Sequence, residues 1–216
     1  MITKGDGFDL HWEERFPEGR RYAFAGIILF VFLIVIYGNS FHCAWQFDDT
    51  PNIVENKNIF LKTLDPADMA KTFYEPGKDS IGRPLSYLSF ALNYYVGGLD
   101  VRGYHIVNFG IHYLASLFLF LFLYNTLKLP TVRDRYGSAS YGIALLAAVF
   151  WATSPVQTTA VTYIVQRMAS LAGLLYIMAL YFYLKGRTAN RPWSRIYLWG
   201  LCFLAAALSF AAKENA

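Results

Sequence analysis

Charged residues are scarce in this sequence, because Asp, Glu, Lys and Arg make up only 16% of its 216 residues. Cysteine occurs only twice, and Cys43 and Cys202 have neither the spacing of a metal site nor an expected disulfide partner in each other. Apolar residues, in contrast, reach 56% and aromatic residues 18%. The composition is therefore that of an integral membrane protein.

Apolar segments of membrane-crossing length recur along the chain. They predict an all-α integral membrane fold with about five transmembrane helices and an external loop that carries one or two juxtamembrane helices. The predicted spans are residues 22–38, 105–127, 138–154, 159–184 and 196–212. The third has the shortest apolar core, at residues 141–152, so this segment could instead be re-entrant or buried.

Lys and Arg gather in three segments: the tail at residues 1–21, the loop after the second span and the loop after the fourth. The positive-inside rule places all three on the cytoplasmic side. The N-terminus is therefore predicted to be cytoplasmic and the loop at residues 39–104 external. These flanks account for the net charge of +4, so no nucleic-acid partner is expected. The first apolar run lacks a signal-peptidase pattern after it, which indicates a retained signal anchor.

The external loop contains two helix signals. Asp65 followed by Pro66 predicts a short helix that extends to Phe73. A second helix is predicted to begin at Pro84 and to end at the glycine turn of residues 96–100. Its apolar face carries Leu85, Leu88, Leu92 and Tyr95, and another face carries Ser86, Ser89 and Asn93. Such a helix can lie on the bilayer surface or against the bundle.

Ionisable residues gather at the predicted external ends of the helices. A rise of about 1.5 Å per residue, counted outward from the cytoplasmic ends, places them at one level. His105, Asn108 and His112 share one helical face because they are three and four residues apart. The residues expected to converge on one external surface are Asp48, Asp49, His105, His112, Arg167 and Lys213. Ionisable groups at this depth are costly, so the cluster is a candidate functional site.

Each of these residues also has a purely structural interpretation. The Asp48–Asp49 pair could be the solvated start of a loop, and the histidines could be interfacial side chains that hydrogen-bond to neighbours. Arg167 and Lys213 could be snorkelling anchors, and Arg83 could be a solvated helix start. Basic residues at the external ends oppose the usual charge bias, and this favours an anionic partner there.

Four segments occur in order: FDDTPNIVENKNI, RPLSYLSFALNYYVGGLDVRGYHIVNFGIHYL, SPVQTTAVTYIVQRMASLAGLLY and AAKEN. Together they resemble the N-terminal membrane region of the transmembrane and tetratricopeptide-repeat proteins of the GT-C glycosyltransferase superfamily. The resemblance covers residues 47–216 and implies a partial GT-C fold. It also implies a transferase that moves a sugar, often mannose, from a polyprenyl-phosphate donor to an acceptor hydroxyl, with protein Ser or Thr as the expected acceptor.

The resemblance further implies roles for individual residues. Asp48 and Asp49 match the acidic pair of the first external loop, with Asp48 as the general base. Asp49 would orient the acceptor or a water, or hold a divalent cation if one is used. With His112 added from the shared helix face, the residues expected to bind the donor phosphate or line the pocket are Arg83, His105, Asn108, His112, Arg167, Lys213 and Glu214. Direct displacement would invert the anomeric centre without a covalent enzyme intermediate.

The family pattern continues with further membrane helices and repeats, so the chain is expected to be a fragment that ends before them. Thr159 stands where many proteins of this pattern carry an acidic residue. A non-catalytic membrane anchor for such repeats is the alternative function. A transporter or channel is a weaker alternative, because no broken helix or midplane charge is predicted. A bacterial inner membrane is expected rather than the endoplasmic reticulum.

Overall fold

The computed structural model describes residues 17–214, and their regular structure is helical apart from one isolated antiparallel bridge between Tyr74 and Ile81. Most of the predicted tail at residues 1–21 lies outside the described residues. The long helices are α1 (Glu18–Tyr37), α4 (Val101–Leu127), α6 (Ser140–Ala152), α8 (Arg167–Thr188) and α9 (Pro192–Ala212). Four segments are long and apolar enough to cross a membrane, or five with the bent pair 130–152 and 155–162. The all-α membrane fold is thus confirmed.

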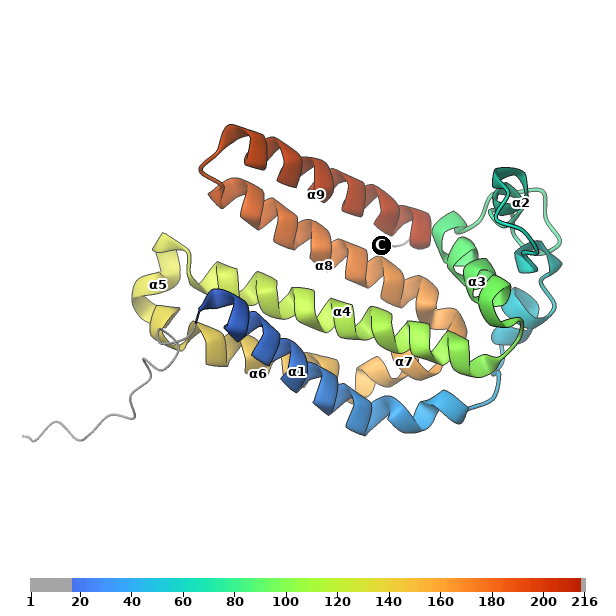
Figure 1. Ribbon diagram of the computed structural model, residues 1–216, viewed down its shortest axis with the longest axis horizontal. Helices are drawn as coiled ribbons and strands as arrows, with labels where there is room; N and C mark the ends of the chain where they lie inside the picture. Colours follow the sequence, from blue (N-terminus) through green and yellow to red (C-terminus); the bar gives the residue numbers. More distant parts are fainter. Residues whose placement is uncertain (1–16, 215–216) are drawn as a thin grey trace, which may run out of the picture.

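Helix α4 lies at the centre of the bundle (Figure 1). It contacts α1 and α6 on one side and α8 on the other, and α9 packs against α8. The start of α1, the short helix α5 (Pro130–Tyr136) and the α8–α9 turn lie at one end, whereas α2, α3 and the end of α9 lie at the opposite end. Arg20 and Arg21 at the start of α1 therefore share one end of the bundle with the basic segments around α5 and the α8–α9 turn. Which end faces the cytoplasm stays a prediction.

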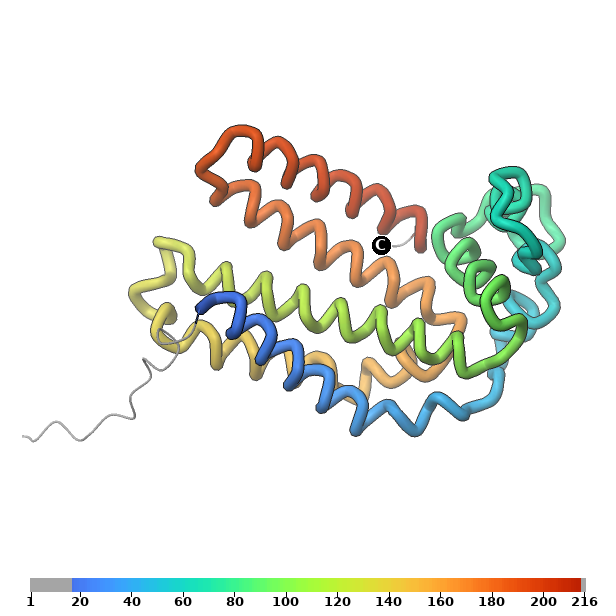
Figure 2. Tube along the Cα trace, in the orientation of Figure 1, coloured from blue at the N-terminus to red at the C-terminus, as the bar shows by residue number. Residues whose placement is uncertain are grey.

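Two breaks interrupt the region between α6 and α8. Helix α6 ends at Ala152, and Pro155 opens a 3-10 turn because its ring removes a backbone donor and keeps Ser154 extended. Helix α7 (Thr158–Thr162) then follows, at 52° to the helical segment before it, as the trace in Figure 2 shows. At Tyr163 the backbone is extended again, with φ −97° and ψ 110°. The prediction of an uninterrupted helix over 159–184 is wrong, and so is the expectation that no helix is broken.

Side chains from other helices satisfy the backbone freed at the first break. The carbonyl oxygen of Ala152, the last residue of α6, accepts hydrogen bonds from Tyr37 Oη at 3.1 Å and His112 Nε2 at 2.9 Å. In a membrane an unpaired carbonyl has no water to bind, so a break of this kind requires such partners. Alanines at 144, 148 and 152 let α6 approach α4 closely.

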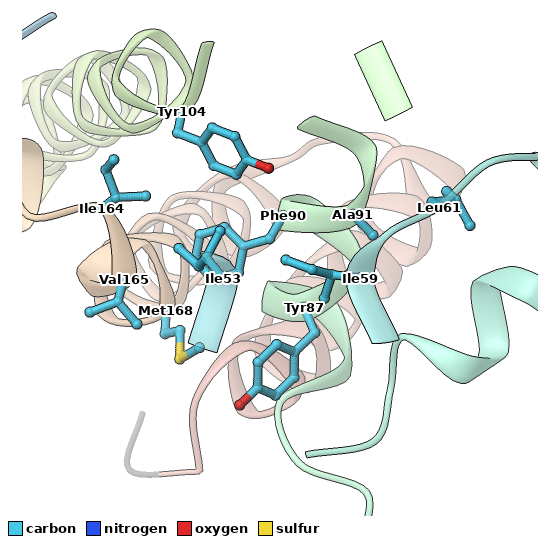
Figure 3. Packing of buried hydrophobic residues seen from close by; sticks show 10 residues of the cluster. All are labelled: Ile53, Ile59, Leu61, Tyr87, Phe90, Ala91, Tyr104, Ile164, Val165 and Met168. Carbon is cyan, nitrogen blue, oxygen red and sulfur yellow. The ribbon is translucent and has the colours of Figure 1, made fainter. Parts of the chain in front are cut away.

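The loop between α1 and α4, which is predicted to be external, packs onto the end of the bundle and contains three short helical turns and two helices. They are η2 (Gly38–His42), η3 (Thr50–Val54), η4 (Lys57–Ile59), α2 (Pro66–Lys71) and α3 (Pro84–Gly97). Helix α2 therefore ends two residues earlier than predicted. Figure 3 shows the apolar cluster that holds the loop, in which Ile53 and Ile59 lie with Phe90 of α3, Tyr104 of α4 and Ile164 of the 3-10 turn η7 (Ile164–Gln166). The loop is part of the folded core.

Helix α3 turns its small polar face toward the bundle and the Leu92 and Tyr95 part of its apolar face away from it, whereas Leu85 packs against α8 and α9. Ser86 is fully buried and donates to the Ala212 carbonyl oxygen at 2.8 Å, whereas Leu92 and Tyr95 are exposed. At the end of α3, Gly98 has a φ of 60°, a conformation that favours glycine, and the chain turns back into α4. The outward apolar face of α3 is suited to the membrane interface.

Candidate functional site

The buried Asp49 side chain joins the loop after α1 to the second break, which lies at Tyr163. Its Oδ2 accepts the Gln46 N–H at 2.9 Å and its Oδ1 accepts the Val165 N–H at 2.7 Å. The side chain is fully buried. Burial raises the pKa of the Asp49 carboxyl above its ordinary value, and the two backbone hydrogen bonds oppose that rise. Asp49 therefore positions the loop and presents no free oxygen to a substrate.

Asp48 is the exposed member of the acidic pair. Its backbone N–H donates to Tyr163 Oη at 2.9 Å, and its carbonyl oxygen accepts from Asn52 Nδ2 at 2.9 Å. These bonds fix the Asp48 backbone while the carboxylate remains at the surface. Tyr163, which the sequence did not single out, lies at the α7–α8 break where neither glycine nor proline marks an irregularity.

Arg167 is fully buried at the start of α8, so it does not lie at the surface as predicted. Its guanidinium lies 4.6 Å from the centre of the Phe90 ring. It donates to Asn108 Oδ1 at 2.7 Å, Asn93 Oδ1 at 2.6 Å, and the Tyr104 and Ser89 carbonyl oxygens at 2.9 and 3.2 Å. A guanidinium has five N–H donors, and four are engaged by neutral oxygens. Arg167 joins α3, α4 and α8 and is not available to a ligand phosphate.

Asn108 and His105 serve the same junction from α4. Asn108 Nδ2 donates to the Ile164 carbonyl oxygen at 3.2 Å, so this side chain binds the backbone freed at the second break. His105 Nε2 donates to the Cys43 carbonyl oxygen at 3.1 Å, while His105 Nδ1 has no hydrogen-bond partner. Both side chains are fully buried. Their predicted shared face is real, but it faces the protein interior.

His112 lies deeper in the bundle, beside the first break. Its ring stacks on Trp151 with centroids 5.3 Å apart, and its Nε2 is bound to the Ala152 carbonyl oxygen. It lines a partly open pocket of about 170 Å³ between α4, α6, α7 and α8. His112 therefore does not belong to the surface that Asp48 occupies.

Arg83 and Glu214 form an ion pair at the end of the bundle that carries α2 and α3. Arg83 Nε and Nη2 bind the two Glu214 carboxylate oxygens at 2.8 and 2.7 Å, and Nη1 contacts Met168 Sδ at 3.1 Å. Arg83 lowers the pKa of the Glu214 carboxyl to about 2. Lys213, between α9 and Glu214, is half-buried. This pair joins the start of α3 to the end of α9.

The predicted site thus separates into two sets. Asp48, Arg83 and Glu214 reach the surface at the end of the bundle that carries α2 and α3, with Lys213 beside them. Asp49, His105, Asn108, His112 and Arg167 are buried and bind the backbone of the loop and of the two breaks. A single surface cluster of all the predicted residues does not form.

The acidic pair does not fit a divalent cation. In residues 17–214, no group of three or more His, Cys, Asp or Glu side chains is arranged to hold a metal ion. Both carboxylate oxygens of Asp49 already accept backbone hydrogen bonds, which leaves Asp48 as a single ligand.

No family model and no solved structure matches the chain. Its sequence is similar to that of protein O-mannosyl-transferase Tmtc1 of Drosophila melanogaster, with 33% identity over 187 residues, which cover 84% of this chain and 20% of the relative. Protein O-mannosyl-transferase TMTC3 of Mus musculus is 30% identical over 190 residues, 83% of this chain and 19% of the relative. Protein O-mannosyl-transferase tmtc2 of Xenopus laevis is 30% identical over 188 residues, 84% of this chain and 21% of the relative.

These three relatives are animal proteins, so they give no support to the expectation of a bacterial inner membrane. The chain spans about a fifth of the length of each. The similarity extends over most of the chain, and the long apolar helices agree with a membrane region. The chain is therefore homologous to part of the transmembrane and tetratricopeptide-repeat family of protein O-mannosyl-transferases.

Proposed function

We propose that the protein is a membrane glycosyltransferase that moves a sugar, mannose in view of the relatives' names, from a polyprenyl-phosphate donor to a hydroxyl of a protein acceptor. The observation that carries this proposal is the difference in environment between the two residues of the acidic pair. Asp49 is locked in the interior, and it holds Asp48 at the surface with its carboxylate exposed. An exposed carboxylate on a fixed backbone is what a general base requires.

The chemistry that follows is an inverting displacement. As the acceptor oxygen attacks the anomeric carbon, its proton passes to the Asp48 carboxylate, and the bond to the phosphate oxygen breaks with its electrons remaining on the phosphate. Cations near the departing phosphate would stabilise its charge. Of the residues expected to bind the phosphate, Lys213 and Arg83 reach this surface, with Arg83 paired to Glu214, whereas Arg167 is enclosed by the protein. Lys213 and Arg83, rather than Arg167, are therefore proposed to stabilise the charge of the departing phosphate.

The proposal places this end of the bundle on the extracytoplasmic side and the N-terminus in the cytoplasm. The basic residues at the opposite end support this orientation through the positive-inside rule. A polyprenyl tail would then remain in the bilayer while its phosphate and sugar reach Asp48.

The test is sugar transfer from dolichyl-phosphate mannose to a Ser/Thr-containing peptide, by the protein that carries this region, in membranes. We expect Asp48→Asn to lower kcat by roughly 10²- to 10⁴-fold, the usual contribution of a positioned base. The fold should be retained, because the bonds to Tyr163 Oη and Asn52 Nδ2 that fix Asp48 involve its backbone N–H and carbonyl oxygen.

Asp79→Asn is the matched control, because Asp79 is another exposed aspartate of the same loop. It should transfer sugar at the wild-type rate. A wild-type rate for Asp48→Asn would show that Asp48 is not the base.

The buried residues also favour a second candidate function. Asp49, Asn108 and Arg167 lie in the segments that resemble the family, and all three are explained by the hydrogen bonds that hold the fold. A non-catalytic membrane anchor would need the same residues. Such an anchor would not transfer sugar in the assay above, and Asp48→Asn would have no effect on its function.

A further inference from the structure

Phe47 has an unusual conformation in the same turn. Its φ is 35°, and it is the only residue other than glycine with a positive φ in the part of the chain that the structure describes. This left-handed conformation is disfavoured for a bulky aromatic residue. The ring is also 87% exposed, so Phe47 gains no stability by burying its side chain. Neither backbone preference nor packing explains a phenylalanine here.

The surrounding turn imposes this conformation. The Asp49 N–H donates to the Gln46 carbonyl oxygen at 2.8 Å and the Thr50 N–H donates to the Phe47 carbonyl oxygen at 3.2 Å. The Asp49 carboxylate ties the same turn to Val165. Strain of this kind persists where neighbouring contacts enforce it, and it is commonly found at functional sites. The Phe47 ring is therefore held outward on a fixed support.

The polar groups beside Phe47 indicate the chemistry of a ligand. The Asp48 carboxylate is exposed, and Tyr163 Oη both accepts the Asp48 N–H and interacts with the Asp48 side chain, so the phenol and the carboxylate lie together at this turn. An aromatic face next to a carboxylate and a phenol suits a ligand with one apolar face and several hydroxyl groups. A pyranose ring has this character, because its axial C–H groups lie on a ring face and its hydroxyls lie at the edge.

We propose that Phe47, Asp48 and Tyr163 form a binding site for a hexose ring, in which Phe47 contacts the sugar face and Asp48 and Tyr163 bind its hydroxyls. The inference rests on the proposed function, since it names the part of the site that takes the transferred sugar. Insertion of the Phe47 ring into the bilayer is less consistent with the turn. Gln46 and Asp48 flank it and are exposed, and burying the carboxylate in lipid would be costly.

The test measures sugar binding directly. Methyl α-D-mannopyranoside is titrated into the protein in lipid nanodiscs, and binding is followed by saturation-transfer difference NMR. Phe47→Gly removes the ring and suits the positive φ, so this variant should fold as well as the wild type. We expect it to weaken binding about tenfold or more, the loss expected for an aromatic contact, and Phe47→Tyr to bind like the wild type.

Val96→Gly is the matched control, because Val96 is also 85% exposed at the same end of the bundle. It should leave sugar binding unchanged. Equal binding by the wild type and Phe47→Gly, or no binding by either, would overturn the assignment. A change in melting temperature in lipid, with sugar binding unchanged, would also overturn it and would identify Phe47 as a bilayer contact.

The transfer assay separates this inference from the proposed function. We expect Phe47→Gly to raise KM for the lipid-linked sugar more than it lowers kcat. Transfer by the wild type with unchanged KM in Phe47→Gly would refute the sugar contact and leave the transferase proposal standing. Ring-dependent sugar binding without transfer by any variant would support the site and refute the transferase.

Discussion

Arg167 shows, at the scale of single residues, how a charged side chain can be structural in this protein. A buried guanidinium is expensive to desolvate, and here four neutral oxygens compensate it. Arg167→Gln would leave several of those oxygens without a donor, so we expect a loss of about 3 kcal/mol or more in the free energy of unfolding. Thermal unfolding in detergent micelles measures this loss.

Arg167→Lys should also be destabilising, because a single ammonium cannot reach four acceptors arranged around a planar group. Arg102→Lys is the control, since Arg102 is exposed near the start of α4. If Arg167→Lys melted at the wild-type temperature, the guanidinium would not be the centre of this junction.

The sequence predicted which residues belong to the candidate site, but not whether their side chains are buried or exposed. Counting along a straight helix correctly placed Arg167 and Asn108 near one level, because the rise of a helix is constant. It could not show that the external loop folds over that level and encloses both residues. The hydrogen bond from Arg167 to Asn93 joins residues that are 74 positions apart in the sequence. A hydropathy pattern carries no information on which distant residues meet. Asp48 and Asp49 are adjacent, yet only the tertiary hydrogen bonds make one buried and the other exposed.

At the scale of elements, the helices were predicted better than their breaks. Apolar length indicated the spans because burial in lipid requires it. Pro155 gave a visible signal for the first break, whereas Tyr163 gave none for the second. The sequence identified the polar and the apolar face of α3. It did not show which face points toward the bundle, since a membrane offers an apolar environment on the outside of the bundle. The polar face turned inward because Ser86 and Asn93 find partners there.

The α8–α9 hairpin depends on one glycine. A Cβ atom added at Gly186 would lie 2.3 Å from Trp199 Cδ1, much closer than van der Waals contact. We expect Gly186→Leu to separate the two helices or displace the Trp199 ring, at a cost of roughly 1–3 kcal/mol in the free energy of unfolding. Gly200→Leu is the control, because nothing lies within 4 Å of a Cβ at that position. Equal melting temperatures for the two variants would contradict close packing at Gly186.

At the scale of the whole molecule, function depends on which end of the bundle faces outward. Two exposed aspartates mark the ends, since Asp79 lies in the loop beside the candidate site and Asp134 lies in α5 at the basic end. In a background with Cys43 and Cys202 replaced by serine, we expect Asp79→Cys to react with a membrane-impermeant maleimide in sealed cells. Asp134→Cys should react only after the membrane is opened, because the positive-inside rule keeps the basic end in the cytoplasm. The reverse pattern would place Asp48 and Phe47 in the cytoplasm, away from any donor sugar presented on the outer face, and would refute the proposed orientation.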